Sequence, residues 1–283
     1  MALALHRRVG LLCPDERLGE RARMEEDPTE VAPMNKWAYV DGLQIHYRTS
    51  KKVVAEGCPA VVLVHGLMVS SRYMVPTLKR LARHYRTYAP DLPGFGKSEK
   101  PSLTLDMAGL SDALAAWMDA LGLEGAALVG NSIGCQIIAE LAVRRPELVE
   151  RAVLQGATMD AHGRSVCRQI ARFLLDVPRE YPSLWGLALR DYLVAGTRRG
   201  WSTLRYAMEN RIEENLPQLR APTLVVRGSR DPICPQRWAE EMVQILPEGR
   251  LAVLPGAAHA ANFGAPAELV GVIREFLGEG KEV

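Results

Sequence analysis

The chain has 283 residues, of which 48% are hydrophobic, 24% are charged and only 6% are aromatic. A chain of this length can bury a large core without disulfides or structural metals, as one large domain or two small ones. Its 35 Lys and Arg nearly balance 33 Asp and Glu, so the formal net charge is +2. This balance excludes nucleic acid as an expected partner, because such binding depends on neutralising phosphates.

The cysteines and the hydropathy pattern indicate a cytoplasmic protein with no membrane span. The five cysteines are scattered and form no C-x-x-C pair, which argues against a zinc or redox centre. The first residues place their charge after a very short apolar run, the reverse of a secretory signal. The most apolar long window, residues 126–143, is interrupted by polar residues that a membrane span would not tolerate.

The first part of the chain divides into an arm and a hairpin. Residues 1–34 are rich in charge and carry no sustained periodicity, which predicts a mobile N-terminal arm. Two short apolar runs, at 37–40 and 43–47, then flank Asp41-Gly42, a strong signal for a tight antiparallel turn. We therefore expect the body of the protein to open with a β-hairpin.

Short apolar runs then alternate with helical patterns. Runs of Val and Leu bounded by turns are typical of buried parallel strands, and the alternation predicts a doubly wound α/β sheet. Between residues 159 and 216 the helical patterns follow one another with no strand between them. This segment is expected to form a helical lid, inserted into a core of residues 35–158 and 217–283. The strand-like runs lie at 60–64, 86–89, 125–129, 151–154, 223–226 and 251–254.

A candidate nucleophile lies between one of these strands and the following helix. Residues 130–134 read Gly-Asn-Ser-Ile-Gly, the G-x-S-x-G pattern. A sharp turn from strand to helix needs small flanking residues, and it lifts the hydroxyl of Ser132 clear of the sheet. The start of the helix also directs backbone N–H groups and a partial positive charge to this place.

A serine hydroxyl needs a base, and the base needs a group that orients it. Asp231 follows the strand at 223–226 and His259 follows the strand at 251–254, at the edge where open α/β sheets form their sites. The order Ser132, Asp231, His259 is that of the α/β-hydrolase triad. Asp160 is the main rival for the acid. His65, in the pair His65-Gly66, is expected to hold its loop by a ring hydrogen bond.

Acyl transfer also needs hydrogen-bond donors for the tetrahedral oxyanion. The backbone N–H of Ile133 follows the nucleophile directly, and that of Leu67 lies at the end of the neighbouring central strand. We expect these two groups to form the oxyanion hole. Because backbone groups serve this purpose, the side chains of Leu67 and Met68 are free to form the wall of the pocket.

The chain carries five motifs, which are His65-Gly66, 91–98 (DLPGFGKS), 130–134, 228–232 (GSRDP) and 259–263 (HAANF). In this order they resemble the motifs of the α/β-hydrolase superfamily, over about residues 37–280. The resemblance implies a mostly parallel eight-stranded sheet with helices on both faces and an inserted cap. Ser132 at the turn argues against the branches that use a carboxylate nucleophile. The chain resembles bacterial esterases and the meta-cleavage-product C–C hydrolases, which also favour Asn before the nucleophile.

The chain departs from the C–C hydrolases at two places. Those enzymes usually carry a Gly-Pro-Gly loop after His-Gly and a Trp after the catalytic His, whereas this chain has residues 67–71 (LMVSS) and Ala260. A cap arginine that meets a substrate carboxylate would be Arg168, Arg172 or Arg190. The residues expected to bind substrate are Met68, Asn131, Phe173, Trp185, Arg190 and Phe263.

The sequence therefore predicts a serine hydrolase that cleaves carboxylic esters of small to medium, mainly apolar acyl groups and requires no metal or organic cofactor. Its expected partner is a small-molecule ester, and the oligomeric state, monomer or homodimer, stays open. One alternative keeps the triad and cleaves a C–C bond in a vinylogous diketone acid. A second alternative is a ligand-binding member of the fold with weak catalysis.

Overall fold

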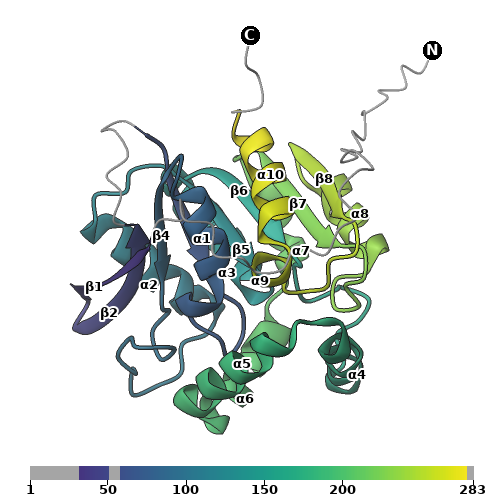
Figure 1. Ribbon diagram of the computed structural model, residues 1–283, viewed down its shortest axis with the longest axis horizontal. Helices are drawn as coiled ribbons and strands as arrows, with labels where there is room; N and C mark the ends of the chain where they lie inside the picture. The colour runs from purple at the N-terminus through teal and green to yellow at the C-terminus, as the bar shows by residue number, and fades with distance from the viewer. Residues whose placement is uncertain (1–31, 51–57, 279–283) are drawn as a thin grey trace.

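A computed structural model describes residues 32–50 and 58–278 of the chain. Its centre is one eight-stranded sheet with the strand order β1-β2-β4-β3-β5-β6-β7-β8 (Figure 1). The pairs β1·β2 and β2·β4 are antiparallel, and the other pairs are parallel. The strands are β1 (Pro33–Val40), β2 (Leu43–Ser50), β3 (Ala60–Val64), β4 (Arg86–Pro90), β5 (Ala126–Asn131), β6 (Val149–Gln155), β7 (Thr223–Gly228) and β8 (Gly249–Leu254).

The predicted mostly parallel sheet and the predicted hairpin are confirmed. Val40 pairs with Leu43 across the turn at Asp41 and Gly42, and the two strands stay in register as far as Pro33 and Ser50. The strands are longer than the sequence pattern indicated. Strand β1 already includes Pro33 and Met34, which the sequence analysis assigned to the arm, because their backbones pair with β2. The rest of the predicted arm lies outside the described residues.

Helices cover both faces of the sheet. The side chains of Val62 and Val64 on β3 pack toward α2, α3 and α8, whereas Val61 and Leu63 pack toward α1 and α10. Alternate residues of a strand point to opposite faces, so each central strand feeds two apolar cores. These helices are α1 (Val75–Leu81), α2 (Met107–Ala120), α3 (Ile133–Arg144), α8 (Gln236–Ile245), α9 (Ala261–Gly264) and α10 (Pro266–Leu277).

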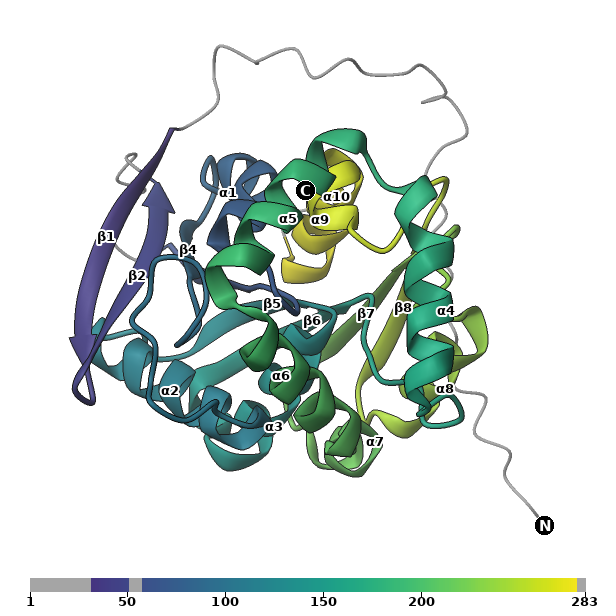
Figure 2. The ribbon, with the colours of Figure 1, turned by 90° about the horizontal axis from the view of Figure 1, so that it is seen from below.

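The segment between β6 and β7 forms the helical layer that the sequence analysis expected as a lid. It contains α4 (Val166–Asp176), α5 (Pro182–Ala195), α6 (Thr197–Glu209) and the short α7 (Ile212–Asn215). Helices α4, α5 and α6 lie across the carboxyl ends of the central strands (Figures 1 and 2). Within the described ranges, no helix has the length and apolar character that a membrane crossing requires.

Candidate active site

Ser132 lies at the turn between β5 and α3, in a backbone conformation that few residues adopt. Its φ is 58° and its ψ is −121°. Such a conformation is strained for a residue with a side chain and is concentrated at functional sites. Ser132 is partly exposed, whereas its neighbours Asn131 and Ile133 are buried. The turn therefore presents one hydroxyl above the carboxyl edge of the sheet.

The two glycines of the motif let β3, β5 and α3 approach one another closely. A Cβ added at Gly130 would lie 2.7 Å from the carbonyl carbon of Gly134. A Cβ added at Gly134 would lie 2.5 Å from the carbonyl oxygen of Val64, at the end of β3. Both contacts are with backbone atoms, which cannot move aside as a side chain can. The G-x-S-x-G pattern is thus a packing requirement of this turn.

The predicted base and acid meet at the same edge of the sheet. The Nδ1 atom of His259 lies 3.0 Å from Oδ2 of Asp231, and both side chains are buried. The other carboxylate oxygen of Asp231 accepts hydrogen bonds from the backbone N–H groups of Ile233 (2.8 Å) and Cys234 (3.0 Å). These bonds hold the Asp231 carboxylate in one orientation, with its second oxygen beside Nδ1 of His259.

The end of β6 joins the nucleophile to the base. The backbone N–H of Ser132 donates to the carbonyl of Gln155 at 3.0 Å. The next residue is Gly156, where an added Cβ would lie 2.9 Å from Nδ1 of His259 and 3.3 Å from Oδ2 of Asp231. Because any larger residue at this position would meet the His–Asp pair, Gly156 leaves the space that the pair occupies.

A buried network of amides supports the base, and it contains one predicted substrate residue. The side-chain amide of Gln155 donates to the carbonyl of His259 (2.7 Å). Asn131 donates to Gln155 (2.7 Å) and accepts from the hydroxyl of Tyr73 (3.0 Å). Asn131 was predicted to bind substrate, but these bonds engage both ends of its amide. In the structure the Asn131 amide therefore links Tyr73 to Gln155 at the end of β6.

Two carboxyl groups of the lid contact the backbone of the base. Asp176, at the end of α4, accepts from the N–H of His259 (3.4 Å), and Glu180 accepts from the N–H of Ala260 (2.5 Å). Glu180 also donates a hydrogen bond to Asp176. The sequence analysis missed both acids because no motif marks them; the one available signal was a pair of acids four residues apart in an apolar and basic segment.

These acids shift one another's pKa and that of the base. Burial raises the pKa of Asp176, and burial together with the neighbouring Asp176 carboxyl raises the pKa of Glu180 to about 7. Burial by itself would lower the pKa of His259. The Asp231 carboxylate, with its hydrogen bond, and the carboxyls of Asp176 and Glu180 outweigh that effect and raise the pKa of His259 to about 9.

The loop after β3 passes directly beside the nucleophile. A Cβ added at Gly66 would lie 3.2 Å from the Cβ of Ser132. Leu67 follows in this loop, and Ile133 begins α3, where the first N–H groups of a helix have no acceptor within the helix. The structural role predicted for His65 is confirmed: its Nδ1 lies 2.9 Å from the carbonyl of Gly66, and its Nε2 accepts from the N–H of Leu92 (3.0 Å).

The rival acids have other partners. Asp160 is buried and forms ion pairs with Arg172 (2.7 Å) and Arg237 (3.0 Å), which join the lid to α8. Asp91 forms a buried pair with His46, whose Nδ1 lies 2.7 Å from its carboxylate. Three hydrogen bonds, that from His46 included, outweigh the effect of burial and lower the pKa of Asp91 to about 2. Neither carboxylate is the one paired with His259.

Three lid residues predicted to bind substrate have exposed side chains. Phe173 is 59% exposed, Trp185 is 47% exposed, and Arg190 is also exposed. Trp185 donates its ring N–H to the carbonyl of Val177 (3.2 Å), within the lid itself. The reason is the orientation of the helices, because α4 turns Gln169 and Asp176 toward the core in place of its apolar residues. The structure therefore does not bury these three side chains against the triad.

Two other predicted substrate residues lie between the lid and the core. Met68 has a φ of 60°, and its side chain packs against α6, where an added Cβ at Gly200 would overlap the Met68 sulfur. Phe263 stacks on Tyr73, with ring centroids 6.3 Å apart and an angle of 8° between the planes. Both residues are partly buried. Their role in binding an acyl group stays a prediction.

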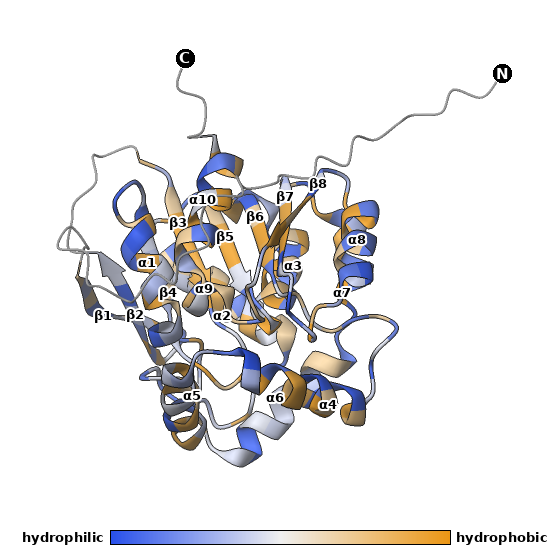
Figure 3. Cartoon of the chain, turned by 45° about the vertical axis from the view of Figure 1, so that its right-hand side comes forward, coloured by the Kyte–Doolittle hydropathy of each residue, from blue (hydrophilic) through white to orange (hydrophobic). Residues whose placement is uncertain are grey.

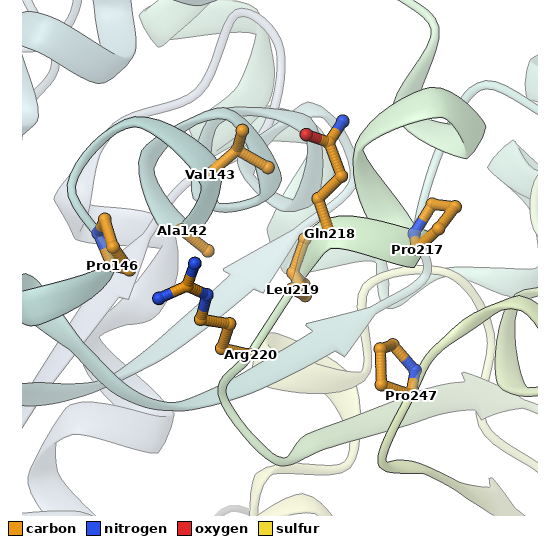
Figure 4. Close-up of a pocket in the computed structure, with 8 residues that line it drawn as sticks. All are labelled: Ala142, Val143, Pro146, Pro217, Gln218, Leu219, Arg220 and Pro247. Atoms are coloured by element: carbon orange, nitrogen blue, oxygen red, sulfur yellow. The ribbon is translucent and has the colours of Figure 1, made fainter.

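A surface pocket of about 440 Å³ lies elsewhere in the molecule (Figure 4). It is found beside the amino ends of β6, β7 and β8, whereas the three residues of the predicted triad follow the carboxyl ends of β5, β7 and β8. None of the predicted site residues lines it. Its lining residues are Ala142, Val143, Pro146, Pro217, Gln218, Leu219, Arg220 and Pro247.

Comparisons with known proteins agree with this architecture. A 2-hydroxymuconate semialdehyde hydrolase from Pseudomonas putida is 29% identical over 259 residues, which cover 82% of this chain and 92% of that protein. The structure is similar to that of a thermophilic esterase from Thermogutta terrifontis, with a TM-score of 0.73, 23% identity, and coverage of 87% and 98%. It is also similar to CarC, a serine hydrolase involved in carbazole degradation, with a TM-score of 0.70, 22% identity, and coverage of 88% and 100%.

The family model of the α/β hydrolases matches residues 61–272. This range begins in β3 and ends in α10, so it contains the nucleophile turn, the lid and the loops that carry Asp231 and His259. The chain belongs to the α/β hydrolase family.

Proposed function

We propose that this hydrolase is a serine esterase that cleaves carboxylic esters of small to medium, mainly apolar acyl groups. The observation that carries the proposal is the combination of a strained, partly exposed Ser132 with a buried His259–Asp231 pair 3.0 Å apart. The esterase structure and the hydrolase relatives support the same class of reaction. A small-molecule ester is the proposed partner.

In the proposed mechanism His259 acts as the general base through Nε2, because its Nδ1 faces Asp231. His259 removes the proton of Ser132, whose oxygen then attacks the ester carbonyl. The backbone N–H groups of Leu67 and Ile133 stabilise the oxyanion, and the alcohol leaves with the proton from His259. Water then attacks the acyl-enzyme by the same route and releases the carboxylic acid.

The state of the base sets the pH range. Only neutral His259 can accept the proton, and its pKa of about 9 means that most of the base is protonated at neutral pH. We expect kcat/KM for a neutral ester to rise with pH up to about 9. Ester hydrolysis should therefore be fastest in mildly alkaline solution.

The positions of the lid arginines favour the esterase proposal over the C–C hydrolase alternative. The sequence analysis named Arg168, Arg172 and Arg190 as candidates for binding a substrate carboxylate. Arg168 and Arg190 are exposed, and Arg172 is paired with Asp160. Two of these guanidinium groups are thus exposed to solvent, and the third already has a carboxylate partner. Because one relative is named a 2-hydroxymuconate semialdehyde hydrolase, the test below includes C–C cleavage as one of its outcomes.

The proposed location is the cytoplasm. The four cysteines in the described ranges, Cys58, Cys135, Cys167 and Cys234, all carry free thiols. Free thiols are the usual state in a reducing compartment.

Hydrolysis of p-nitrophenyl esters of increasing acyl length tests the proposal. The wild-type protein should turn over short esters at pH 8–9, and Ser132→Ala should lower kcat by about 10⁵–10⁶-fold. Equal turnover by the two proteins would overturn the proposal. A ring-fission dienoate tested in parallel separates the alternatives, because a C–C hydrolase would prefer it by a large factor in kcat/KM. Binding of ligand without turnover would favour the non-catalytic alternative.

A further inference from the structure

Within the described residues, the exposed large hydrophobic side chains are concentrated in the lid. Among the described residues, fourteen large hydrophobic side chains are exposed, and eleven of them lie between residues 170 and 201. Single exposed apolar residues are ordinary, but a concentration of them in one layer marks an interaction site. The eleven are Ile170, Phe173, Leu174, Leu175, Tyr181, Trp185, Leu189, Tyr192, Leu193, Val194 and Trp201.

Helix α4 buries polar side chains and exposes apolar ones. A surface helix normally buries its apolar face and exposes its polar face. In α4 the buried residues are Gln169 and Asp176, whereas Ile170 is 48% exposed and Leu174 is 63% exposed. Packing of the lid onto the core therefore does not explain the apolar residues of this helix.

Helices α5 and α6 continue the pattern. Helix α5 buries Leu184, Asp191 and Ala195, and its opposite side presents Leu189 (61% exposed) and Leu193 (71% exposed). A shallow groove of about 400 Å³ follows that side. Its lining residues are Gly186, Leu189, Arg190, Leu193 and Val194.

On α6, Trp201 is 59% exposed and projects from the side opposite the buried Gly200, Thr203 and Ala207. Arg198 precedes it by three residues and Arg205 follows it by four. Residues at this spacing lie on one side of a helix. Tryptophan is enriched at membrane–water interfaces, and interfacial helices combine such apolar groups with Lys and Arg.

The charges of the three helices are segregated. Between residues 166 and 209 the exposed basic residues are Arg168, Arg190, Arg198 and Arg205, and the exposed acid is Glu209, which pairs with Arg205. The other acids of this segment turn inward: Asp176 and Asp191 are buried and Glu180 is partly buried. The outer side of the lid therefore carries apolar and aromatic groups together with uncompensated positive charge.

We propose that the outer sides of α4, α5 and α6 form a docking surface for an anionic lipid bilayer. The three helices lie in one layer at the same end of the molecule, and their outer sides face away from the sheet (Figures 1 and 2). In Figure 3 hydrophobic and hydrophilic residues are interspersed along these helices. Apolar groups would enter the headgroup region while the arginines bind lipid phosphates, the combination that holds interfacial helices on anionic membranes.

The charges favour a bilayer over a second copy of the chain. A symmetric dimer brings the same patch of both subunits together, so the positive charges of Arg190 and Arg198 would be buried against a patch of the same sign. The inward orientation of Asp176 and Asp191 leaves little negative charge to balance them. An anionic bilayer supplies that charge. Docking of this kind is independent of whether Ser132 hydrolyses esters.

Vesicle flotation of the full chain tests the docking surface. The Ser132→Ala protein avoids hydrolysis of lipid during the measurement and should bind phosphatidylcholine vesicles containing a quarter phosphatidylglycerol at least tenfold more tightly than pure phosphatidylcholine. Binding should weaken as salt is added. Arg190→Gln with Arg198→Gln should weaken it by roughly fivefold per arginine, and Leu189→Ser with Leu193→Ser should weaken it at least as much.

Matched controls use exposed residues outside the lid. Arg220→Gln with Arg250→Gln removes the same charge, and Leu103→Ser removes an exposed leucine (77% exposed). Both should bind vesicles as the parent protein does, and thermal denaturation verifies that every variant is folded. Three outcomes would overturn the proposal: no vesicle binding at low salt, equal weakening in the controls, or a dimer in sedimentation that Leu189→Ser with Leu193→Ser abolishes.

Discussion

The carboxyl edge of the sheet and the lid above it differ in how closely their residues pack. At the sheet edge, backbone segments approach so closely that Gly134 has no room for a Cβ, and each polar group of Asp231 has a fixed partner. In the lid, a Cβ at Gly186 would meet nothing within 4 Å, and apolar side chains face outward. Close packing fixes the position of reactive groups, whereas the lid is free to carry surface chemistry of its own.

After the loss expected for Ser132→Ala, the largest effect should come from Asp231, the proposed acid at the sheet edge. Asp231→Asn keeps the shape of the side chain but removes the charge that orients His259 and stabilises its protonated form. We expect kcat/KM for a p-nitrophenyl ester to fall about 10⁴-fold with the protein still folded by circular dichroism. Asp160→Asn, which removes an acid that joins the lid to α8, should change kcat/KM by less than tenfold. An equal loss in both variants would contradict the assignment of Asp231.

The next effect concerns the packing under the nucleophile. Gly134→Ala places a methyl group 2.5 Å from the carbonyl oxygen of Val64, so α3 must move away from β3. Overpacking of this kind costs roughly 1–3 kcal/mol of stability. Since β3 leads into the loop with Leu67, kcat should fall as well. Urea denaturation and ester hydrolysis measure the two changes. A variant with unchanged stability and activity would show that the close approach at Gly134 is unimportant.

The sequence predicted the sheet edge well because its geometry is local. A strand, a turn with glycines at 130 and 134, and a helix are contiguous in the chain, so the pattern itself indicates the sharp turn at Ser132. Asp231 and His259 are distant from it in sequence, but each follows a strand of the same sheet. Parallel strands bring their carboxyl ends together, so the position after a strand is enough to predict the meeting.

The lid was predicted less well because its helices obey no local rule for orientation. Phe173 and Trp185 were expected near the site on the assumption that apolar residues turn inward. In α4 the inward residues are Gln169, which donates to the nearby carbonyl of Gly163, and Asp176, which accepts from the N–H of His259 far away in the chain. The contact of Glu180 with Ala260 is of the same kind. Neither composition nor helical periodicity carries information about such contacts.

The acid pair of the lid should set the pH dependence of the core site. Glu180→Gln keeps an acceptor for the N–H of Ala260 but removes a carboxyl that raises the pKa of His259. The pKa of His259 should therefore fall from about 9, and the rising limb of the profile of kcat/KM against pH should move to lower pH. A fall of one unit would raise kcat/KM at pH 7 about tenfold.

Glu241→Gln is the matched control, because Glu241 pairs with the exposed His162 and takes no part in the shift at His259. Its pH profile should coincide with that of the wild type. If Glu180→Gln lowered kcat/KM at every pH without moving the profile, the contact at Ala260 would be structural alone, and the electrostatic link between lid and base would be wrong.

The smallest expected effect is a gain in stability, whereas Gly134→Ala should cause a loss. Gly186 lies inside α5 with a helical backbone and open space where a Cβ would be, so alanine adds a methyl group without a clash. Alanine in a helix interior is favoured over glycine by about 0.5–1 kcal/mol, mainly through the unfolded chain. Gly186→Ala should raise the urea midpoint slightly and leave ester hydrolysis unchanged. The same substitution that disrupts the sheet edge at Gly134 should therefore stabilise the lid, and a loss of stability at both positions would show that the lid is packed as tightly as the core.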